Sequence, residues 1–409
     1  MRLKAEIKLT KQIKNWIQIG VVRPCLWTLY IILHTFSIKR RNRVVVMIIE
    51  KHFFDNTKAL APVLSEEKDL DVGYIVKHES VRKEMIEAGY QVMPMLSIKA
   101  LIFFLTAPFV IFSYGSSFIE MFPYFISPRW QEITFMGHGI PVKALSRLVP
   151  KYQHYGNHLL LQQYSHALCS GKPESETLCH AHNISIEETW ITGMPRTDRL
   201  VELMQQPSSV QTDIKKGDRS AILYAPTWRA YGKTDFFPFE DFDLTALKKW
   251  LDTHHAILYF RVHKEDLHLN KSFFDQLDME GPFRMVNQDF EADAVEILPQ
   301  FDLLISDFSA IVTDFLPIDR PIVFIPYDYK EYEEQVGFLF PYSKMTTGDI
   351  VDSQVSLLEA LESGLNHPER DQKERQTLCN ELYDFVDTKS SLRVVAEIKR
   401  ALFEKQLHP

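Results

Sequence analysis

Residues 302–332 constrain the fold of this chain more than any other stretch. The segment reads DLLISDFSAIVTDFLPIDRPIVFIPYDYKEY, with buried strands expected at 303–306 and 322–325 and a short helix that begins near Ser309. Two buried strands joined by a helix predict a parallel βαβ unit. Asp307 stands where the first strand ends, and there free backbone N–H groups and the positive end of a helix favour phosphate. Because Ser and Asp are also ordinary helix caps, this unit does not establish a phosphate site by itself.

Buried strands and helical stretches alternate along most of the chain. Besides those two, strands are expected at 44–49, 71–76, 91–95, 133–138, 167–171, 189–194, 220–226, 256–263 and 283–286, and the apolar stretch 100–114 is expected to be a helix end leading into a buried strand. Strands separated by helices predict parallel, doubly wound sheets. The polar segment 205–219 is broken by Pro and Gly and reads as a linker. We therefore predict an N-terminal α/β domain (43–204) and a C-terminal α/β domain (220–409), with a cleft between them.

Composition excludes several classes of protein. A chain of 409 residues with 45% hydrophobic and 24% charged residues can bury two full cores. The net charge of −8 argues against general nucleic-acid binding, so no nucleic-acid partner is expected. Four scattered cysteines without a CxxC pair favour a reducing compartment. No cofactor and no metal are predicted, since the run CHAH at 179–182 lacks zinc spacing and reads as ordinary helix.

The N-terminal region 1–42 has a different character. A lysine-rich start is followed by mostly apolar residues 19–38 and then by a basic cluster at 39–43. Arg23 and Pro24 interrupt the apolar part, so a helix lying in a membrane surface fits better than one that spans it. Basic side chains facing anionic lipid predict a peripheral protein on the cytoplasmic face of a membrane. The alternative is a basic helix packed against the first domain.

A histidine flanked by glycines follows the strand expected at 133–138. In GHGIPVK, His138 can act as a general base near neutral pH, and Lys143 adds positive charge for a phosphate. The flanking glycines allow close approach of a ligand. The alternative is a turn with a capping histidine, and this segment alone does not decide between the two.

Two arginines follow strands on either side of the predicted linker. Arg196, in TGMPRTD, either contacts a donor phosphate or pairs with a neighbouring carboxylate. Arg229, in YAPTWR, suits bidentate contact with phosphate, and Thr227 of the same segment is a candidate for nucleotide contact. The alternative for Arg229 is an arginine stacked on Trp228 in a structural corner.

Two further segments carry groups suited to a phosphate or a ribose. Arg261 and His263 close the strand expected at 256–263, and strand alternation puts both on one side, where they fit the charge that develops on a leaving phosphate. Glu296 lies on a helical stretch before the strand at 303–306. Its carboxylate either accepts a hydrogen bond from a ribose hydroxyl or lies exposed on the helix.

Taken together, these segments resemble the CDP-glycerol glycerophosphotransferase family, the teichoic acid and capsule polymerases and primases. The likeness is carried by HG-x-P-x-K, TG-x-PR-x-D, YAPTWR, R-x-H and SDFS with a following DF, and it covers roughly residues 130–340 in order. Two positions depart from the family pattern. Ile140 stands where the family often has Thr, and Gln335-Val336 precede Gly337-Phe338, where the family often has Arg just before the Gly-Phe pair.

The resemblance implies a GT-B-like fold of two Rossmann-like domains facing a cleft, often with a membrane-associating N-terminal region. It implies that the second domain binds the CDP end of a donor, that His138 is the base, and that His263 with Arg261 stabilises the departing CMP. The donor and phosphate contacts expected on this basis are Lys143, Arg196, Arg229, Asp307, Ser309, Ala310 and Asp314.

The sequence thus predicts a transferase that moves glycerol phosphate, or a related polyol phosphate, from a CDP-activated donor to a hydroxyl and releases CMP. The expected acceptor is a lipid-linked glycan or a growing cell-surface polymer. A first alternative is a GT-B glycosyltransferase, in which the same cleft would attack a sugar carbon of a nucleotide sugar. A second is a non-catalytic membrane scaffold that binds nucleotide, which the convergence of polar groups at strand ends disfavours.

Overall fold

A computed structural model describes most of the chain. The described residues are Thr28, 41–113, 131–150, 165–206, 214, 217–229, 231–286 and 293–407. The predicted membrane-associating region 1–42 and most of the predicted linker 205–219 lie outside them, so both stay predictions. Among the described residues, no helix combines the length and the apolar character that crossing a membrane requires.

The first half of the chain builds a seven-stranded parallel sheet with the order β3-β2-β1-β4-β5-β6-β7. Its strands are β1 (Arg43–Ile48), β2 (Asp71–Val76), β3 (Val92–Pro94), β4 (Phe109–Phe112), β5 (Glu132–Phe135), β6 (His166–Cys169) and β7 (Thr189–Ile191). The central strands β1 and β4 are runs of buried apolar residues, as a parallel sheet covered on both faces requires. The strand order reverses between β1 and β4, and ligands of open α/β sheets bind at such a reversal.

Helices cover both faces of this first sheet. They are α3 (Asp55–Glu66), α4 (Glu79–Glu87), α5 (Ile98–Leu105) and α8 (Lys172–His182), while α9 (Pro195–Gln205) packs on α3 and places Leu200 in the core of the second unit. Side chains of α3 and α4 pack into the core on one face, whereas α5 and α8 contribute to the core on the other. Each helix thus buries an apolar side against the sheet.

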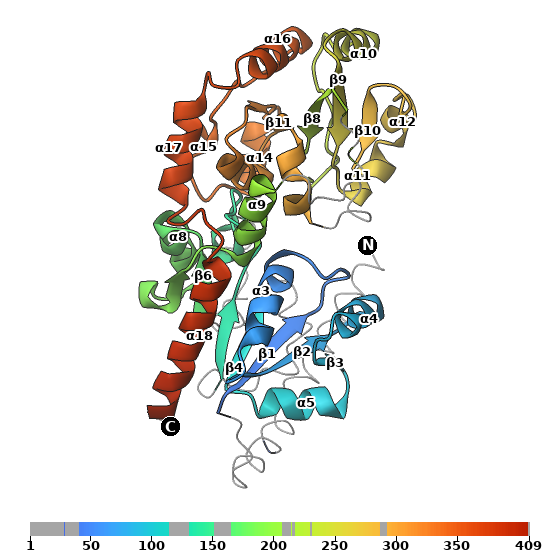
Figure 1. Cartoon of the computed structure of the whole chain (residues 1–409). Coiled ribbons are helices and arrows are strands. Elements are labelled where there is room, and N and C mark those ends of the chain that lie inside the picture. The colour runs from blue at the N-terminus through green and yellow to red at the C-terminus, as the bar shows by residue number, and fades with distance from the viewer. Residues whose placement is uncertain are drawn as a thin grey trace, which may run out of the picture.

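The second half builds a five-stranded parallel sheet with the order β10-β9-β8-β11-β12. Its strands are β8 (Ser220–Tyr224), β9 (Ala256–Phe260), β10 (Phe283–Met285), β11 (Leu303–Ser306) and β12 (Ile322–Phe324). Its helices are α10 (Leu244–Thr253), α11 (Lys264–Leu269), α12 (Lys271–Phe274), α13 (Ile311–Phe315), α14 (Tyr329–Gln335), α15 (Tyr342–Met345), α16 (Gln354–Asn366) and α17 (Gln372–Leu382). Figure 1 shows the two sheets as separate α/β units, one above the other. Parallel sheets in two units confirm the predicted α/β class.

The helix expected to begin near Ser309 starts two residues later. α13 begins at Ile311, is five residues long and continues into a 3₁₀ turn at Leu316–Ile318. Asp319, in the left-handed region at φ 56°, ends this turn. The segment after β11 is therefore a loop of four residues that leads into a short helix, and not a long helix capped by Ser309.

The last helix, α18 (Ser390–Leu407), returns to the first sheet. Its buried residues, among them Val394 and Ile398, belong to the same core as β1 and α3. The carboxylate of Asp198 in α9 accepts the backbone N–H groups of Ser390 and Ser391, at 2.8 and 2.7 Å, and so satisfies donors at the start of α18. In Figure 1 this red helix runs beside α3. The range 220–409 thus includes one helix that packs on the N-terminal sheet.

The segment after β5 connects the two units. Ile140 and Val142 are buried in the hydrophobic core of the second unit. The hydroxyl of Thr313 in α13 donates to the carbonyl of Ile140 at 3.0 Å, and the backbone N–H of Leu339 donates to the carbonyl of Val142 at 3.0 Å. The GHGIPVK segment therefore leaves the first sheet and is anchored against the second.

Candidate active site

His138 lies at the carboxyl edge of the first sheet, three residues after β5 ends. The glycines on both sides have positive φ, 68° at Gly137 and 94° at Gly139, which only glycine adopts without strain. A Cβ at Gly139 would lie 2.8 Å from a guanidinium nitrogen of Arg196 and 3.0 Å from a carboxylate oxygen of Asp314. The space beside Gly139, which was predicted to admit a ligand, is therefore occupied by charged side chains of the protein itself.

Asp55 pairs with His138 and was not among the predicted site residues. Its Oδ2 lies 2.6 Å from Nδ1 of His138, and the two side chains are 6% and 32% exposed. Asp55 is the first residue of α3 and has φ 60°, an uncommon conformation for a residue other than glycine. Its backbone N–H donates to Oδ2 of Asp293 at 2.8 Å. The second unit therefore helps to fix Asp55 in place.

Arg196 is buried between carboxylates of both units. Its Nε lies 3.1 Å from Oδ1 of Asp55, and its terminal nitrogens lie 3.1 Å from Asp314 and 3.9 Å from Asp293. It also donates to the carbonyl of His138. We call Asp55, His138, Arg196, Asp293 and Asp314 the Arg196 cluster. Of the two readings left open for Arg196, the structure shows pairing with carboxylates, and direct contact with a donor phosphate stays a prediction.

The charges of the Arg196 cluster are not balanced, since one guanidinium faces three carboxyl groups. Burial raises the pKa of Asp314 to about 6, although Arg196 opposes this. Burial acts in the same direction on Asp55, but Arg196 and His138 outweigh it and the pKa of Asp55 is lowered. Asp55 is therefore the ionised carboxylate beside His138, while Asp314 titrates close to neutral pH.

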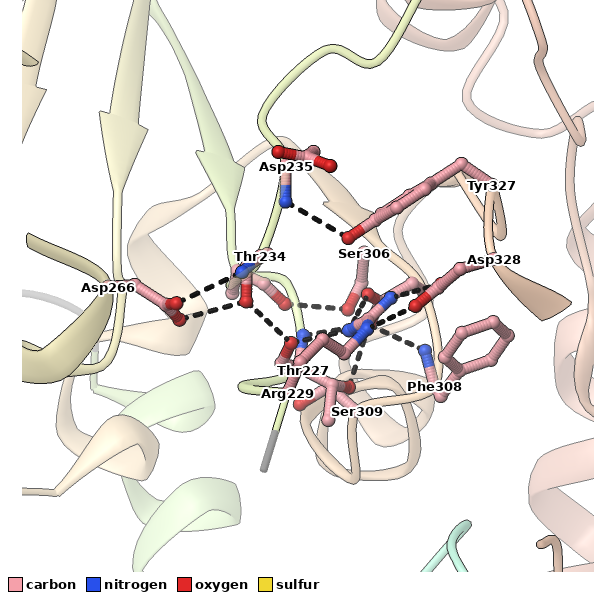
Figure 2. Close-up of polar contacts among 12 residues, drawn as sticks. Thr227, Arg229, Thr234, Asp235, Asp266, Ser306, Phe308, Ser309, Tyr327 and Asp328 are labelled. Carbon is pink, nitrogen blue, oxygen red and sulfur yellow. Dashed lines mark hydrogen bonds and ion pairs between the residues drawn. The ribbon is translucent and has the colours of Figure 1, made fainter. Parts of the chain in front are cut away.

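The second group of charges lies at the carboxyl edge of the second sheet (Figure 2). Arg229 follows β8 and is 1% exposed. Its guanidinium makes two hydrogen bonds to Asp328, at 2.8 and 2.7 Å, and one to Asp307 at 2.7 Å. The other oxygen of Asp307 accepts the backbone N–H and the hydroxyl of Thr227, at 2.8 and 2.7 Å. We call Thr227, Arg229, Asp307 and Asp328 the Arg229 cluster.

Aromatic rings enclose the guanidinium of Arg229. It lies 5.1 Å from the ring centre of Phe308 and 5.2 Å from those of Tyr327 and Tyr332. Asp328 also accepts a hydrogen bond from the hydroxyl of Tyr231 at 2.8 Å. The cluster thus fastens the loops after β8, β11 and β12 to one another. Contact of Arg229, Asp307 or Thr227 with a donor stays a prediction.

Trp228 stacks on His263 and not on Arg229. The two ring centres are 4.9 Å apart, and Trp228 is 42% exposed. His263 caps α11, with its Nδ1 accepting the backbone N–H of Glu265 at 3.3 Å. β9 ends at Phe260, so strand alternation does not extend to Arg261 and His263 as expected. Arg261 is 9% exposed, and its N–H donates to the carbonyl of Tyr224 in the neighbouring strand at 3.0 Å.

Four predicted residues remain to be placed. Lys143 is exposed and pairs through its backbone with Phe338, and desolvation by the surrounding protein lowers its pKa. Ser309 and Ala310 are half-buried in the loop before α13, where the hydroxyl of Ser309 accepts the N–H of Ile311 at 3.4 Å. Figure 2 shows Ser309 beside the Arg229 cluster.

Glu296 lies in a 3₁₀ turn and not in a longer helix. Its carboxylate pairs with Arg199 through three contacts of 2.9–3.2 Å. This ion pair links α9 of the first unit to the second unit. Contact of Glu296 with a ribose stays a prediction.

Comparison with known proteins identifies a family and several relatives of the chain. A family model described as CDP-Glycerol:Poly(glycerophosphate) glycerophosphotransferase matches residues 29–400. The teichoic acid ribitol-phosphate polymerase TarK of Staphylococcus aureus is 26% identical over 282 residues, which are 66% of this chain and 52% of TarK. The teichoic acid poly(glycerol phosphate) polymerase of Bacillus subtilis is 24% identical over 386 residues, which are 88% of this chain and 48% of that protein. The chain thus spans about half the length of these relatives.

Solved structures show the same fold. A structure of the wall teichoic acid polymerase TagF matches with a TM-score of 0.74 and 19% identity, over 97% of this chain and 98% of the TagF chain. A structure of MnaA from S. aureus with UDP matches with a TM-score of 0.56 and 15% identity, over 88% and 97% of the two chains. The arrangement of two α/β units is therefore shared with a polymerase and with a protein that binds a nucleotide.

Proposed function

Because the chain belongs to the CDP-glycerol:poly(glycerophosphate) glycerophosphotransferase family, we propose that it transfers a polyol phosphate from a CDP-activated donor to a hydroxyl and releases CMP. One observation carries this proposal. The segment that bears His138 is anchored to α13 through Ile140 and Thr313, and α13 directly follows the loop at Ser309. A candidate base and a candidate phosphate loop are therefore joined at the carboxyl edges of two parallel sheets.

His138 acts as the general base in the proposed reaction. It takes the proton of the acceptor hydroxyl while the hydroxyl oxygen attacks the β-phosphorus of the donor. The new bond joins the acceptor oxygen to this phosphorus, and the bond from the phosphorus to the bridging oxygen of CMP breaks. His138 then releases the proton to solvent. The partly exposed ring of His138 beside a buried carboxylate suits this role.

The second unit stabilises the departing CMP. Because Nδ1 of His263 accepts the N–H of Glu265, the neutral ring carries its hydrogen on Nε2, where it can donate to a phosphate oxygen. Arg261 and Lys143 add positive charge, and the backbone at Ser309 and Ala310 offers N–H groups. The exposed ring of Trp228 is suited to stacking on the cytosine.

The donor is a CDP-polyol, most simply CDP-glycerol. Names of the relatives include both glycerol-phosphate and ribitol-phosphate polymerases, so the polyol is the part of the donor that these likenesses leave open. We infer that the acceptor is a lipid-linked glycan or a growing cell-surface polymer. The basic and apolar region 1–42 would hold the protein on anionic lipid at the cytoplasmic face of the membrane.

Incubation of the full chain with CDP-glycerol or CDP-ribitol, in the presence of membrane lipid extract, tests this proposal. We expect CMP and a phosphodiester product with one of the two donors, and no CMP from the His263→Ala variant. UDP-N-acetylglucosamine in the same assay tests the glycosyltransferase alternative. Turnover of this nucleotide sugar to UDP and a glycoside, without CMP from either CDP-polyol, would overturn the proposal.

A further inference from the structure

The geometry points to Asp55 as the positioning residue for His138, a carboxylate that fixes the tautomer of the base and balances its charge when it takes the acceptor proton. This inference rests on the proposed function. It adds a residue that the sequence motifs do not contain, and it gives the second unit a part in orienting a histidine of the first. Asp55 acts through His138 and needs no contact with either substrate.

The first step is the contact itself. Oδ2 of Asp55 lies 2.6 Å from Nδ1 of His138, within the range of a charge-assisted hydrogen bond. An ionised carboxylate only accepts hydrogen bonds, so Nδ1 of the neutral ring must carry the hydrogen. Nε2 is then the nitrogen with the free electron pair, and it is the atom that takes the proton of the acceptor hydroxyl. Asp55 remains ionised throughout this step.

The second step is the rigidity of Asp55. Its backbone N–H donates to Asp293, its Oδ1 accepts the N–H of Asn56 at 2.8 Å, and the same oxygen lies 3.1 Å from Nε of Arg196. Asn56 in turn donates to the carbonyl of Gly137 at 3.0 Å and accepts the N–H of Arg196 at 3.0 Å. The carboxylate and the backbone beside His138 are therefore held by the same contacts, which leaves the pair little freedom to rotate.

The third step concerns charge. Protonated His138 gains the most from an anion that is already close and shielded from water, because the attraction is stronger in a medium of low dielectric constant. The charged groups of the described elements around the pair are Glu50 after β1, Asp55 in α3, Arg196 in α9, Asp293 before the 3₁₀ turn Ala294–Glu296, and Asp314 in α13. The carboxylate of Asp55 is hydrogen-bonded to the ring of His138.

The Asp55→Asn variant tests this role, because asparagine keeps the size of the side chain and loses the charge. We expect kcat for CMP release from CDP-glycerol to fall roughly 10²-fold, while KM for the donor changes less than about twofold. A merely structural role for Asp55 would disturb donor binding as well, so KM would rise together with the fall in kcat.

Asp71→Asn is the matched control. Asp71 pairs with Arg43 at 2.6 Å at the opposite, amino edge of the same sheet. The substitution therefore removes a carboxylate from an ion pair that is remote from His138. We expect its kcat and KM to match those of the unchanged protein. An Asp55→Asn protein that is folded, as judged by circular dichroism, and keeps kcat within threefold would overturn the inference.

A measurement on the unchanged protein covers the case in which Asp55→Asn does not fold. In protein labelled with ¹⁵N-histidine, we expect His138, assigned through His138→Gln, to show a protonated Nδ1 and an unprotonated Nε2 at pH 8. The opposite tautomer would overturn the inference. The result does not depend on CMP release, so a chain that shows this tautomer but turns over no CDP-polyol would overturn the proposed function while supporting the Asp55–His138 pair.

Discussion

The Arg196 cluster and the Arg229 cluster are made of the same chemistry. In each, a buried arginine at the carboxyl edge of a parallel sheet is held by aspartates that come from distant parts of the chain. They differ in two respects. The Arg229 cluster lies within one unit and sets one arginine against two aspartates, whereas the Arg196 cluster spans both units and sets one arginine and one histidine against three.

We propose that this difference reflects two roles: the Arg229 cluster holds loops together, and the Arg196 cluster is the candidate reactive centre. In the Arg229 cluster the arginine is 1% exposed, and its hydrogen bonds to Asp307 and Asp328 join three loops. Burial alone would raise the pKa of Asp328, but the hydrogen bonds and charge of Arg229 outweigh burial, and the pKa of Asp328 is lowered. In the Arg196 cluster, burial, together with the nearby carboxyl groups of Asp55 and Asp293, raises the pKa of Asp314 to about 6, and His138 stays partly exposed. Unbalanced charge next to a partly exposed histidine, the candidate base, is suited to proton transfer.

Replacement of His138 should produce the greatest change. Loss of a general base typically lowers a rate by 10²–10⁴-fold, so we expect His138→Ala to lower kcat for CMP release by roughly 10³-fold. Its free energy of unfolding should fall by about 1–3 kcal/mol, because the buried carboxylate of Asp55 loses a hydrogen-bond partner. Steady-state kinetics and urea unfolding measure the two quantities. A His138→Ala protein with unchanged kcat would remove the distinction between the clusters.

Replacement of Arg229 should mainly lower the free energy of unfolding. Arg229→Met leaves two buried carboxylates without their cation, and breaking such a pair from one side costs about 3–5 kcal/mol. Arg199→Met is the control, since Arg199 makes a more exposed pair with Glu296, and it should cost about 1 kcal/mol or less. Chemical unfolding compares them. Equal effects of the two substitutions would contradict a fastening role for the Arg229 cluster.

Glu174 shows what burial does to a carboxyl whose oxygen accepts a backbone N–H, that of Ser170 at 2.6 Å. Burial raises its pKa from 4.5 to about 7. Between these values the folded protein holds a proton that the unfolded chain has released, so stability falls as pH rises from 4.5 to 7 and is level above 7. The contribution is about 3 kcal/mol at most.

Glu174→Gln should abolish this part of the pH dependence. The amide cannot ionise, and its oxygen can still accept the N–H of Ser170. Urea unfolding at pH 5 and at pH 8 should therefore show a smaller difference in the variant than in the unchanged protein. The same difference in both proteins would mean that Glu174 is ionised in the folded state at pH 5.

Gly139→Ala tests how closely the Arg196 cluster is packed. The added Cβ would meet Arg196 and Asp314 and would also strain a backbone with φ 94°. Gly89→Ala is the control, because Gly89 has φ 88° and no atom would lie within 4 Å of its Cβ. Strain alone costs about 1–2 kcal/mol, and the clash should add about 1–3 kcal/mol and lower kcat. Equal loss of stability in the two variants would show that the side chains of Arg196 and Asp314 can move away from the added Cβ at little cost.

The sequence was sufficient to predict both sheets. The apolar runs 44–49 and 303–306 correspond to buried strands, because burial on both faces of a parallel sheet leaves a continuous hydrophobic signal. The sequence could not predict that α18 packs on the first sheet, because an amphipathic pattern shows that one face of a helix is buried but not which sheet it covers. His138 and His263 were identified from motifs at strand ends.

Asp55 and the burial of the two arginines could not be found in this way. An aspartate at the start of a helix is an ordinary cap, so Asp55 gave no separate signal. Arg229 and Asp328 are 99 residues apart, and Arg196 meets partners from both units. An arginine at a strand end therefore looks the same in sequence whether it will face a phosphate or a buried carboxylate.

The most direct test separates donor binding from chemistry. Calorimetric titration of CDP-glycerol into the unchanged protein and His138→Ala, together with CMP release by both, compares the two steps in one pair of proteins. We predict the same Kd within about threefold and a roughly 10³-fold lower rate for the variant, because His138 meets the acceptor proton and not the donor nucleotide. CMP release at an unchanged rate, or loss of donor binding together with loss of rate, would contradict the assignment of His138 as the base.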